Sequence, residues 1–451
     1  MTDTICAIST ASGVGAISII RISGSEAIKV TNSIFKGPNL NECASHTVHY
    51  GFIISDLEII DEVLVTVMRS PKTFTKEDVV EINCHGGIAT TNKILEILLT
   101  NGCRQAEAGE FTKRAFLNGR IDLTEAEGIE DLIIAKTDSA RKQAINQLKG
   151  SLSELIQNLR GLIIGLRANI EVNIDYPEYE DELEITHELL TTRLSEIKSK
   201  LATILTEAQN GRIIKEGINV ALVGKPNVGK SSILNRLLEE EKAIVTDIAG
   251  TTRDIVEGTI QLSGVGINLV DTAGIRETKD IIEQIGVDKS LEQVEKSDLV
   301  IYVLSNSEPI TKEDKEFIAN ISNKTHIIFI NKDDLESKLD ISKLNLNNIV
   351  YGNTKENDGV ANLKAKIVEL FNLETIATAD FTYLTNARQV ALVKAAIKYT
   401  EEAQNQTKNN VPVDIIAIDI ENIWSTLGEI IGETYKDGLL DELFSKFCLG
   451  K

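Results

Sequence analysis

The sequence is poor in aromatic residues, proline and cysteine. Aromatic residues make up 4% of the 451 residues, and there are 6 prolines. The 5 cysteines are scattered without C-x-x-C spacing, which argues against a disulfide framework and favours reduced thiols. No apolar run reaches the roughly 18–20 residues that span a bilayer, and the first residues lack the basic and apolar regions of a signal peptide. These absences predict a soluble, cytoplasmic protein without a membrane segment.

Positive charge is also in short supply. The chain carries 47 Lys and Arg against 68 Asp and Glu, a net charge of −21. Broad, sequence-independent wrapping of a nucleic acid needs a field of the opposite sign, so the charge argues against it. A local basic patch, or nucleic-acid contact shared with a basic partner, stays open. With 42% hydrophobic and 25% charged residues, the chain has the balance of a globular protein of about three domains.

Four segments differ in their residue patterns. Residues 1–118 mix short β-branched runs with helical patterns and predict an α+β domain. Residues 119–210 and 374–451 are helical, whereas residues 211–373 alternate apolar strands with amphipathic helices. That alternation is typical of a doubly wound α/β domain. We therefore expect an α/β domain inserted in a helical domain that is made of two segments.

The first helical segment carries a periodic apolar face. Apolar residues between positions 152 and 170 keep three-and-four spacing, which predicts a buried face, with Arg160 and Arg167 mostly on the opposite side. Tyr176-Pro177 is expected to end this helix. The acidic run at residues 178–184 is expected to form a solvated loop.

A glycine-rich loop follows the first strand of the α/β segment. Residues 218–223 are apolar, residues 224–231 read G-K-P-N-V-G-K-S, and a helical pattern follows, which is the strand–loop–helix context of a phosphate loop. Backbone N–H groups of such a loop point at phosphates, and the helix N-terminus adds positive charge. We expect Lys230 to act as a catalytic residue on the β- and γ-phosphate oxygens and Ser231 to ligate Mg²⁺. The predicted nucleotide contacts here are Asn227, Val228, Gly229, Lys230, Ser231 and Ser232.

Two switch-like elements follow in the order that a Ras-like G domain requires. In a polar stretch after the helix, one threonine hydroxyl must complete the Mg²⁺ shell, and Thr252 is the choice. The apolar strand at residues 267–270 then ends in a D-T-A-G element, whose carboxylate acts through Mg²⁺. The predicted nucleotide contacts of the two elements are Thr246, Asp247, Ile248, Ala249, Gly250, Thr251, Thr252, Asp271, Thr272, Ala273 and Gly274.

The next strand ends in a base-reading tetrapeptide. Residues 327–330 are apolar and N-K-D-D follows, in which Asp334 is placed to accept hydrogen bonds from guanine N1–H and the 2-amino group. Adenine offers neither donor in that geometry, so the element selects GTP over ATP. A later N-T-K loop resembles the usual S-A-K loosely. The predicted contacts are Asn331, Lys332, Asp333, Asp334, Asn353, Thr354 and Lys355.

One expected residue is missing. In Ras-type enzymes a glutamine that positions the attacking water closely follows the D-x-x-G element. Here the element is followed by Ile275-Arg276-Glu277. Another group must position the water, and Glu277, Asp280 and Glu283 are the candidates in the sequence.

Together these motifs resemble the MnmE (TrmE) family of tRNA modification GTPases, over essentially the whole chain. Outside the G domain the resemblance rests on residues 3–5, 19–24, 81–87, 109–120, 173–177 and the C-x-G-K that ends residues 447–451. It implies a K⁺-stimulated GTPase that forms a homodimer and works with a flavoprotein partner, MnmG. That pair would add a carboxymethylaminomethyl-type group at C5 of the wobble uridine of certain tRNAs, using a one-carbon tetrahydrofolate such as the 5-formyl form.

The resemblance also implies roles for particular residues. Glu283 would be catalytic, because it would orient the hydrolytic water, and Cys448 would serve tRNA modification. K⁺ would be held by Asn227, Thr246, Ile248 and Thr251. The folate would be bound by Arg21, Glu81, Arg120 and Lys451.

A second interpretation is a regulatory GTPase switch that docks on RNA, as in ribosome assembly. Such a switch usually carries a basic RNA-binding appendage. This chain instead carries an α+β segment in an acidic protein and a terminal C-x-G-K. The flanking segments therefore favour the tRNA-modifying enzyme.

Overall fold

The computed structural model describes most of the chain as two compact units. One unit contains Met1–Glu130, Gln147–Lys198 and Leu392–Lys451, and the other contains Asp131–Asn146 and Ser199–Ala391. The described residues are 3–56, 58–175, 180–240, 258–271, 293–341, 347–356, 358–378, 384, 386–434, 437–447 and 450. Among them, no helix is both long and apolar enough to cross a membrane.

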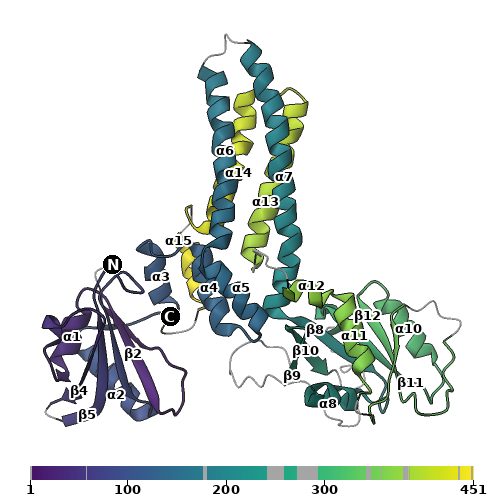
Figure 1. The fold of residues 1–451 in the computed structure, drawn as a ribbon, viewed down its shortest axis with the longest axis horizontal. Helices are drawn as coiled ribbons and strands as arrows, with labels where there is room; N and C mark the ends of the chain where they lie inside the picture. The colour runs from purple at the N-terminus through teal and green to yellow at the C-terminus, as the bar shows by residue number, and fades with distance from the viewer. Residues whose placement is uncertain are drawn as a thin grey trace. The chain divides into compact units, whose positions relative to one another are not determined.

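The N-terminal part of the first unit is a mixed sheet with helices on one face (Figure 1). Its order is β3-β4-β5-β6-β2-β1-β7, antiparallel except for the parallel pair of β1 and β7. In β5, Val63, Val65 and Val67 are buried while Leu64 between them is exposed, as the period of two requires. The elements are β1 (Ile5–Ile8), β2 (Ile17–Ser23), α1 (Ala27–Ser33), β3 (Phe35–Lys36), η1 (Leu40–Glu42), β4 (Thr47–Ser55), β5 (Glu58–Met68), β6 (Val79–His85), α2 (Ile88–Thr100) and β7 (Arg104–Gln105).

Helices from both ends of the sequence make up the rest of this unit. The predicted apolar face of α6 is buried, and α6 packs against α14 from the second helical segment, side by side in Figure 1. Helices α3 (Glu110–Leu117), α6 (Ser151–Asp175), α14 (Val413–Ile431) and α15 (Asp437–Phe444) lie in this unit. Residues of both units make up α4 (Leu123–Ile134), α5 (Asp138–Leu148), α7 (Glu180–Glu216) and α13 (Ala387–Lys408), and α12 (Leu373–Thr378) lies in the second unit.

Two expectations about the helices were wrong. Arg160 is not on a solvent face: it is 5% exposed, its guanidinium lies 4.1 Å from the centroid of the Trp424 ring, and it forms an ion pair with Glu433. The aromatic face and the carboxylate on other segments compensate for the burial of its charge. Of the acidic run expected as a loop, residues 180–184 are helical, because α7 begins at Glu180, and residues 178 and 179 lie outside the described residues. Helix α6 is described as far as Asp175, and Tyr176 and Pro177, which were expected to end it, lie outside the described residues.

The second unit contains a parallel sheet with helices on both faces. Its order is β13-β12-β11-β8-β10-β9, and within it only the β9–β10 pair is antiparallel among the described strands. Apolar residues of α8 and α11 pack on one face and those of α10 on the other. The predicted fold class is therefore confirmed. The elements are β8 (Ile218–Gly224), α8 (Lys230–Glu240), β9 (Gly258–Leu262), β10 (Val265–Asp271), β11 (Leu299–Ser305), α10 (Lys312–Ile321), β12 (His326–Asn331), β13 (Ile349–Tyr351) and α11 (Ala361–Leu370).

Candidate functional site

The phosphate loop lies between β8 and α8, at the carboxyl edge of the parallel sheet. Gly224 and Gly229 have φ values of 156° and 101°. A Cβ on Gly224 would lie 2.6 Å from the carbonyl oxygen of Val303, and one on Gly229 would lie 2.2 Å from Nδ2 of Asn331. Only glycine fits these positions, so the neighbouring strands β11 and β12 set the shape of the loop.

The Lys230 ammonium is folded back over this loop. Its Nζ donates hydrogen bonds to the carbonyl oxygens of Gly224, at 2.6 Å, and Lys225, at 2.8 Å. Ser231 follows in the first turn of α8 and its side chain is exposed. The arrangement puts a cation and a helix N-terminus at one place, which is the charge that a polyphosphate needs.

Two residues of the base-reading tetrapeptide brace the phosphate loop. Asn331 is 1% exposed, and its Nδ2 donates to the carbonyl oxygen of Val228 at 2.9 Å. The Nζ of Lys332 donates to the carbonyl oxygen of Asn227 at 2.8 Å. The sequence placed both residues at the nucleotide but gave no sign of these braces, because the partners are 103 and 105 positions apart.

Asp334 meets the N-T-K loop. The Nζ of Lys355 lies 3.0 Å from Oδ2 of Asp334. Asn353 is buried, and its Oδ1 accepts a hydrogen bond from the backbone N–H of Lys355 at 3.0 Å. The weakly matching loop is thus next to the base-reading carboxylate, where a G domain needs it.

Several predicted residues lie outside the described part of the chain. Asp271 is described only as the last residue of β10, in register with Leu222 of β8. The others are Thr246, Asp247, Ile248, Ala249, Gly250, Thr251, Thr252, Thr272, Ala273, Gly274, Glu283, Cys448 and Lys451.

A second polar site lies on the N-terminal sheet. Arg21 of β2 and Glu81 of β6 are cross-strand neighbours, with Nη2 and Oε1 2.8 Å apart. Nη1 of Arg21 also donates to the carbonyl oxygen of Gly450 at 3.4 Å. The Arg120 guanidinium lies 4.8 Å from the Phe74 ring centroid, and that of Arg21 lies 5.9 Å from it. Two predicted folate residues, Arg21 and Arg120, therefore approach Phe74, which no sequence motif indicated, and Arg21 also contacts Glu81 and Gly450.

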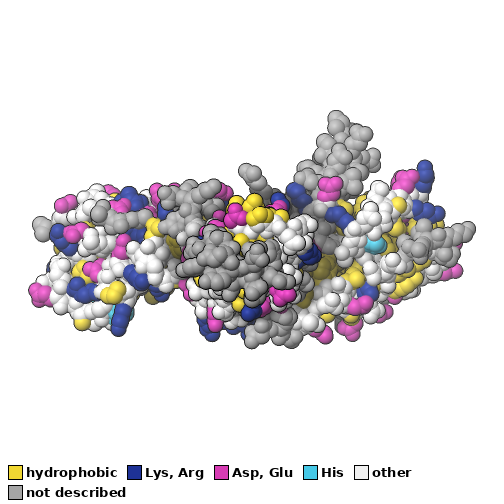
Figure 2. Space-filling model, turned by 90° about the horizontal axis from the view of Figure 1, so that it is seen from above, with side chains coloured by type: hydrophobic (Ala, Val, Ile, Leu, Met, Phe, Trp, Pro, Cys, Tyr) yellow, Lys and Arg dark blue, Asp and Glu magenta, His cyan; other side chains and the backbone are white. Residues whose placement is uncertain are grey.

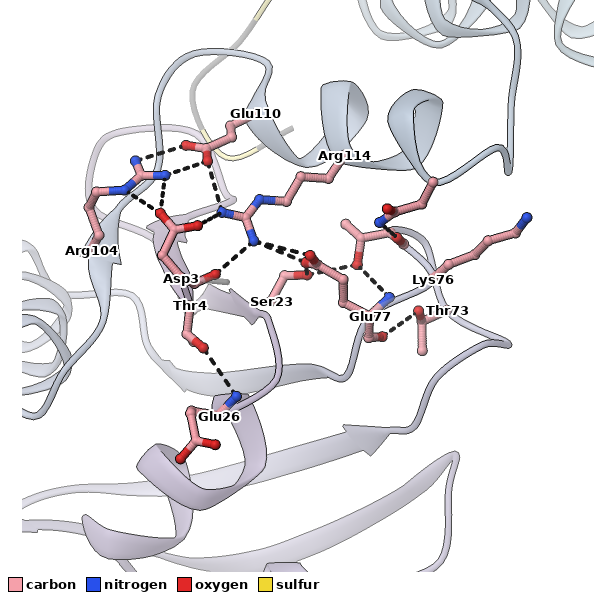
Figure 3. Close-up of polar contacts among 12 residues, drawn as sticks. Asp3, Thr4, Ser23, Glu26, Thr73, Lys76, Glu77, Arg104, Glu110 and Arg114 are labelled. Atoms are coloured by element: carbon pink, nitrogen blue, oxygen red, sulfur yellow. Dashed lines mark hydrogen bonds and ion pairs between the residues drawn. The ribbon is translucent and has the colours of Figure 1, made fainter. Parts of the chain in front are cut away.

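A buried arginine holds the helix next to this site (Figure 3). Arg114 of α3 is 1% exposed and contacts three carboxylates: Asp3 at 2.9 Å, Glu110 at 3.0 Å and Glu77 at 3.2 Å. A hydrogen bond from Arg104 lowers the pKa of Asp3 below its ordinary value. Because buried charges need partners, the network fixes α3 against the sheet and against the loop that carries Glu77.

The loop that presents Phe74 is attached to the end of α3. Nδ2 of Asn118 donates to the carbonyl oxygen of Thr75 at 2.6 Å, and Nη1 of Arg120 donates to that of Phe74 at 2.9 Å. The Arg114 network thereby supports the wall of the second site. Cys84 of β6 is buried in the core of the sheet, and burial raises its pKa to about 11.

The strand ends of the second unit bring a phosphate loop and an N-K-x-D element together at one edge of a doubly wound sheet. In such folds, ligands bind at this edge. This combination defines a Ras-like P-loop protein that binds guanine nucleotides.

Comparisons with known proteins identify the family. The model of the GTP-binding protein TrmE N-terminus matches residues 4–120, and that of the MnmE helical domain matches residues 123–448. The tRNA modification GTPase MnmE of Bacillus cytotoxicus is 50% identical over 456 residues, covering 100% of this chain and 99% of the relative. That of Bacillus anthracis gives the same values. The chain therefore belongs to the MnmE family of tRNA modification GTPases, and it is a GTPase of tRNA modification.

Two solved structures of GTP-binding proteins resemble part of the chain. A single-residue variant of Aquifex aeolicus Era bound to GDP·AlF4⁻ is 27% identical over 40% of this chain and 66% of that chain, with a TM-score of 0.27. The G domain of the T. maritima FeoB iron transporter is 30% identical over 34% of this chain and 97% of that chain, with a TM-score of 0.25. The family assignment rests on the full-length relatives.

Proposed function

We propose that this GTPase acts with the flavoprotein MnmG to add a carboxymethylaminomethyl group at C5 of the wobble uridine of certain tRNAs, using a one-carbon tetrahydrofolate. The full-length family match carries the proposal, since it includes the segments outside the G domain. Such a match favours the modifying enzyme over a ribosome-assembly switch.

The test is mass spectrometry of wobble nucleosides from cells that lack this protein. The modified uridine should be absent and should return when the wild-type chain is supplied. Unchanged nucleosides in the deletion strain would contradict the proposal. Normal uridines together with a defect in ribosomal subunits would support the switch instead.

In the G domain, we propose that the residues of the nucleotide site bind and polarise GTP. Lys230 neutralises the phosphate charge, and Asp334 reads guanine. Mg²⁺ would be held by Ser231 and Thr252, and it would neutralise charge on the β- and γ-phosphates. Glu283 would hold and orient the attacking water.

We also propose a monovalent cation near the phosphate loop, and the structure describes one of its four residues, Asn227. Asn227 is exposed, and its side chain carries an amide oxygen that can act as a ligand. Thr246, Ile248 and Thr251 would complete the K⁺ site with carbonyl oxygens. A cation there would counter the charge that develops on the phosphates.

Hydrolysis by the wild-type enzyme is expected to be at least about tenfold faster in KCl than in NaCl at equal ionic strength, because a carbonyl cage selects cations by size and ligand number. Asn227→Ala should lose this difference. Phosphate release at matched salt concentrations measures both. Equal wild-type rates in the two salts would refute the K⁺ site and leave the GTPase assignment intact.

The site on the N-terminal sheet supports a bound folate. Arg21 and Arg120 present two guanidinium groups, which suit the carboxylates of an anionic ligand. Phe74 offers an aromatic ring near both guanidinium groups, and Glu81 offers a carboxylate that accepts hydrogen bonds. A tetrahydrofolate carries all of the matching groups: carboxylates, a flat ring and ring N–H donors.

Arg21→Met is expected to weaken the binding of 5-formyl-tetrahydrofolate by about 10-fold or more, since it removes charge-assisted hydrogen bonds. Isothermal titration calorimetry measures the affinity. Arg141→Met, on the exposed side of α5, is the matched control and should bind as the wild type. GTP hydrolysis should not change in either variant. Unaltered folate affinity in Arg21→Met would remove Arg21 from the site.

The partner assignments are also proposals. A homodimer is supported by the open face of the N-terminal sheet, where Ile17, Val48, Tyr50 and Leu64 are exposed. Sedimentation velocity would show a monomer if this proposal is wrong.

Figure 2 shows acidic and basic side chains interspersed over the visible face. With a net charge of −21, this favours tRNA binding that is shared with MnmG. The free buried thiols fit a cytoplasmic location.

A further inference from the structure

We propose that Lys225 is a positioning residue for GTP binding, which ties the phosphate loop to the start of α10 through Asp314. Lys225 directly follows the strand glycine of the loop. Its Nζ donates to Oδ2 of Asp314 at 3.2 Å and to Oγ1 of Thr311. Its carbonyl oxygen accepts a hydrogen bond from Nζ of Lys230 at 2.8 Å. One residue therefore touches both the phosphate-binding cation and a helix on the other side of the loop.

Asp314 is a fixed anchor. It is 3% exposed, and it accepts hydrogen bonds from the Tyr302 hydroxyl at 2.7 Å and from the Thr311 backbone and hydroxyl, both at 2.8 Å. The bond from the Thr311 backbone N–H, together with one from the Asp314 backbone N–H to Oγ1 of Thr311 at 3.4 Å, forms the capping box of α10. The Tyr302 ring stacks on that of Phe317 with centroids 4.8 Å apart. Burial alone raises the pKa of Asp314, but the hydrogen bonds outweigh it and the pKa lies below its ordinary value. The anchor is thus rigid and ionised.

The charge of the anchor explains why a lysine suits position 225. A buried carboxylate needs a compensating cation, and Lys225 supplies it; Glu313, also within 3.6 Å of the Lys225 ammonium, is mostly exposed. The ammonium is therefore held in place. This fixes the loop backbone around the two carbonyl oxygens that hold Lys230.

A loop that is held in shape binds nucleotide before any chemistry occurs. It contacts the phosphates in the ground state and in the transition state alike. Loss of such uniform binding raises KM and the dissociation constant without lowering kcat. A merely structural role for Lys225 would instead lower thermal stability and leave nucleotide affinity unchanged.

The test uses the full-length enzyme and a fluorescent GDP analogue. Lys225→Met is expected to weaken GDP binding and raise KM for GTP by about tenfold, with kcat at saturating GTP within about twofold of the wild type. Lys225→Arg, which keeps the charge, should recover most of the affinity. Lys312→Met removes an exposed lysine that pairs with Glu316 in the first turns of α10, and it should bind as the wild type.

Asp314→Asn tests whether Lys225 affects nucleotide binding through its contact with Asp314. The double variant Lys225→Met/Asp314→Asn should bind GDP no more weakly than Asp314→Asn alone, because both changes break the same contact. Additive losses would overturn the proposal. So would a Lys225→Met enzyme with wild-type affinity, or one with a lower kcat and normal KM. If Asp314→Asn fails to fold, the Met and Arg variants of Lys225 decide the question.

Discussion

Replacing Lys230 with methionine is expected to lower kcat/KM for GTP hydrolysis by roughly 10³-fold, the size of effect seen when one preorganised donor is removed from a charged transition state. The Lys230 ammonium already lies over the phosphate loop, bonded to two loop carbonyl oxygens. Methionine has nearly the same length and no charge, so the loop keeps its volume and loses its cation. Phosphate release under single-turnover conditions measures the loss.

Thermal stability is the control for Lys230→Met, because it shows whether the variant still folds. Because Lys230 is only half-buried and its bonds are to backbone oxygens of one loop, the thermal midpoint should stay within a few degrees of the wild type. Hydrolysis within about tenfold of the wild type in a folded Lys230→Met enzyme would be inconsistent with the assigned role.

Asp334→Asn is expected to weaken GTP binding by at least about 100-fold, because a site built to receive the two guanine donors then presents an amide N–H to one of them. The same amide can donate to the 2-oxo group of xanthine, so affinity for XTP should rise. The ammonium of Lys355 lies 3.0 Å from Oδ2 of Asp334, and this contact holds the Asp334 carboxylate in one orientation. Competition binding with GTP, XTP and ATP measures the switch.

Glu336→Gln is the matched control for Asp334→Asn, since it removes one negative charge from an exposed residue two positions along. It should keep the preference for GTP. Unchanged affinity of Asp334→Asn for GTP would mean that another residue reads the base, and equal gains for ATP and XTP would mean that the change only loosened the site.

The sequence predicted those parts of the fold that local pattern controls. The phosphate loop was recognisable because its strand, glycines and helix are contiguous, and the apolar face of α6 followed from its spacing. Arg160 was misplaced because its burial depends on Trp424 and Glu433, which lie far away in the sequence. The domain boundaries at residues 118, 210 and 373 remain predictions.

The sequence also predicted only part of each candidate site. The motif gave the identity of Asn331 and Lys332, but their braces to the phosphate loop depend on how β12 lies beside the other strands. Local sequence patterns predicted even less of the second site, on the N-terminal sheet. Arg21 and Arg120 came from family resemblance, whereas Phe74, which both guanidinium groups approach, belongs to no recognisable pattern. Such contacts are properties of the tertiary structure alone.

The Arg114 network has a consequence for the time at which the N-terminal sheet is completed during synthesis. Asp3 bonds to Arg114 across 111 positions, and β1 needs β7 as its second neighbour. The nascent chain leaves the ribosome from its N-terminus onward, and domains generally fold as units. The β4–β5 and β5–β6 pairs are local and have their partners early. Strand β1 pairs with β2 early, but β7 joins it only after residue 105 has left the exit tunnel, and the contact of Asp3 with Arg114 has to wait for α3. Asp3, among the earliest residues of the chain, is therefore among the last of this sheet to be secured.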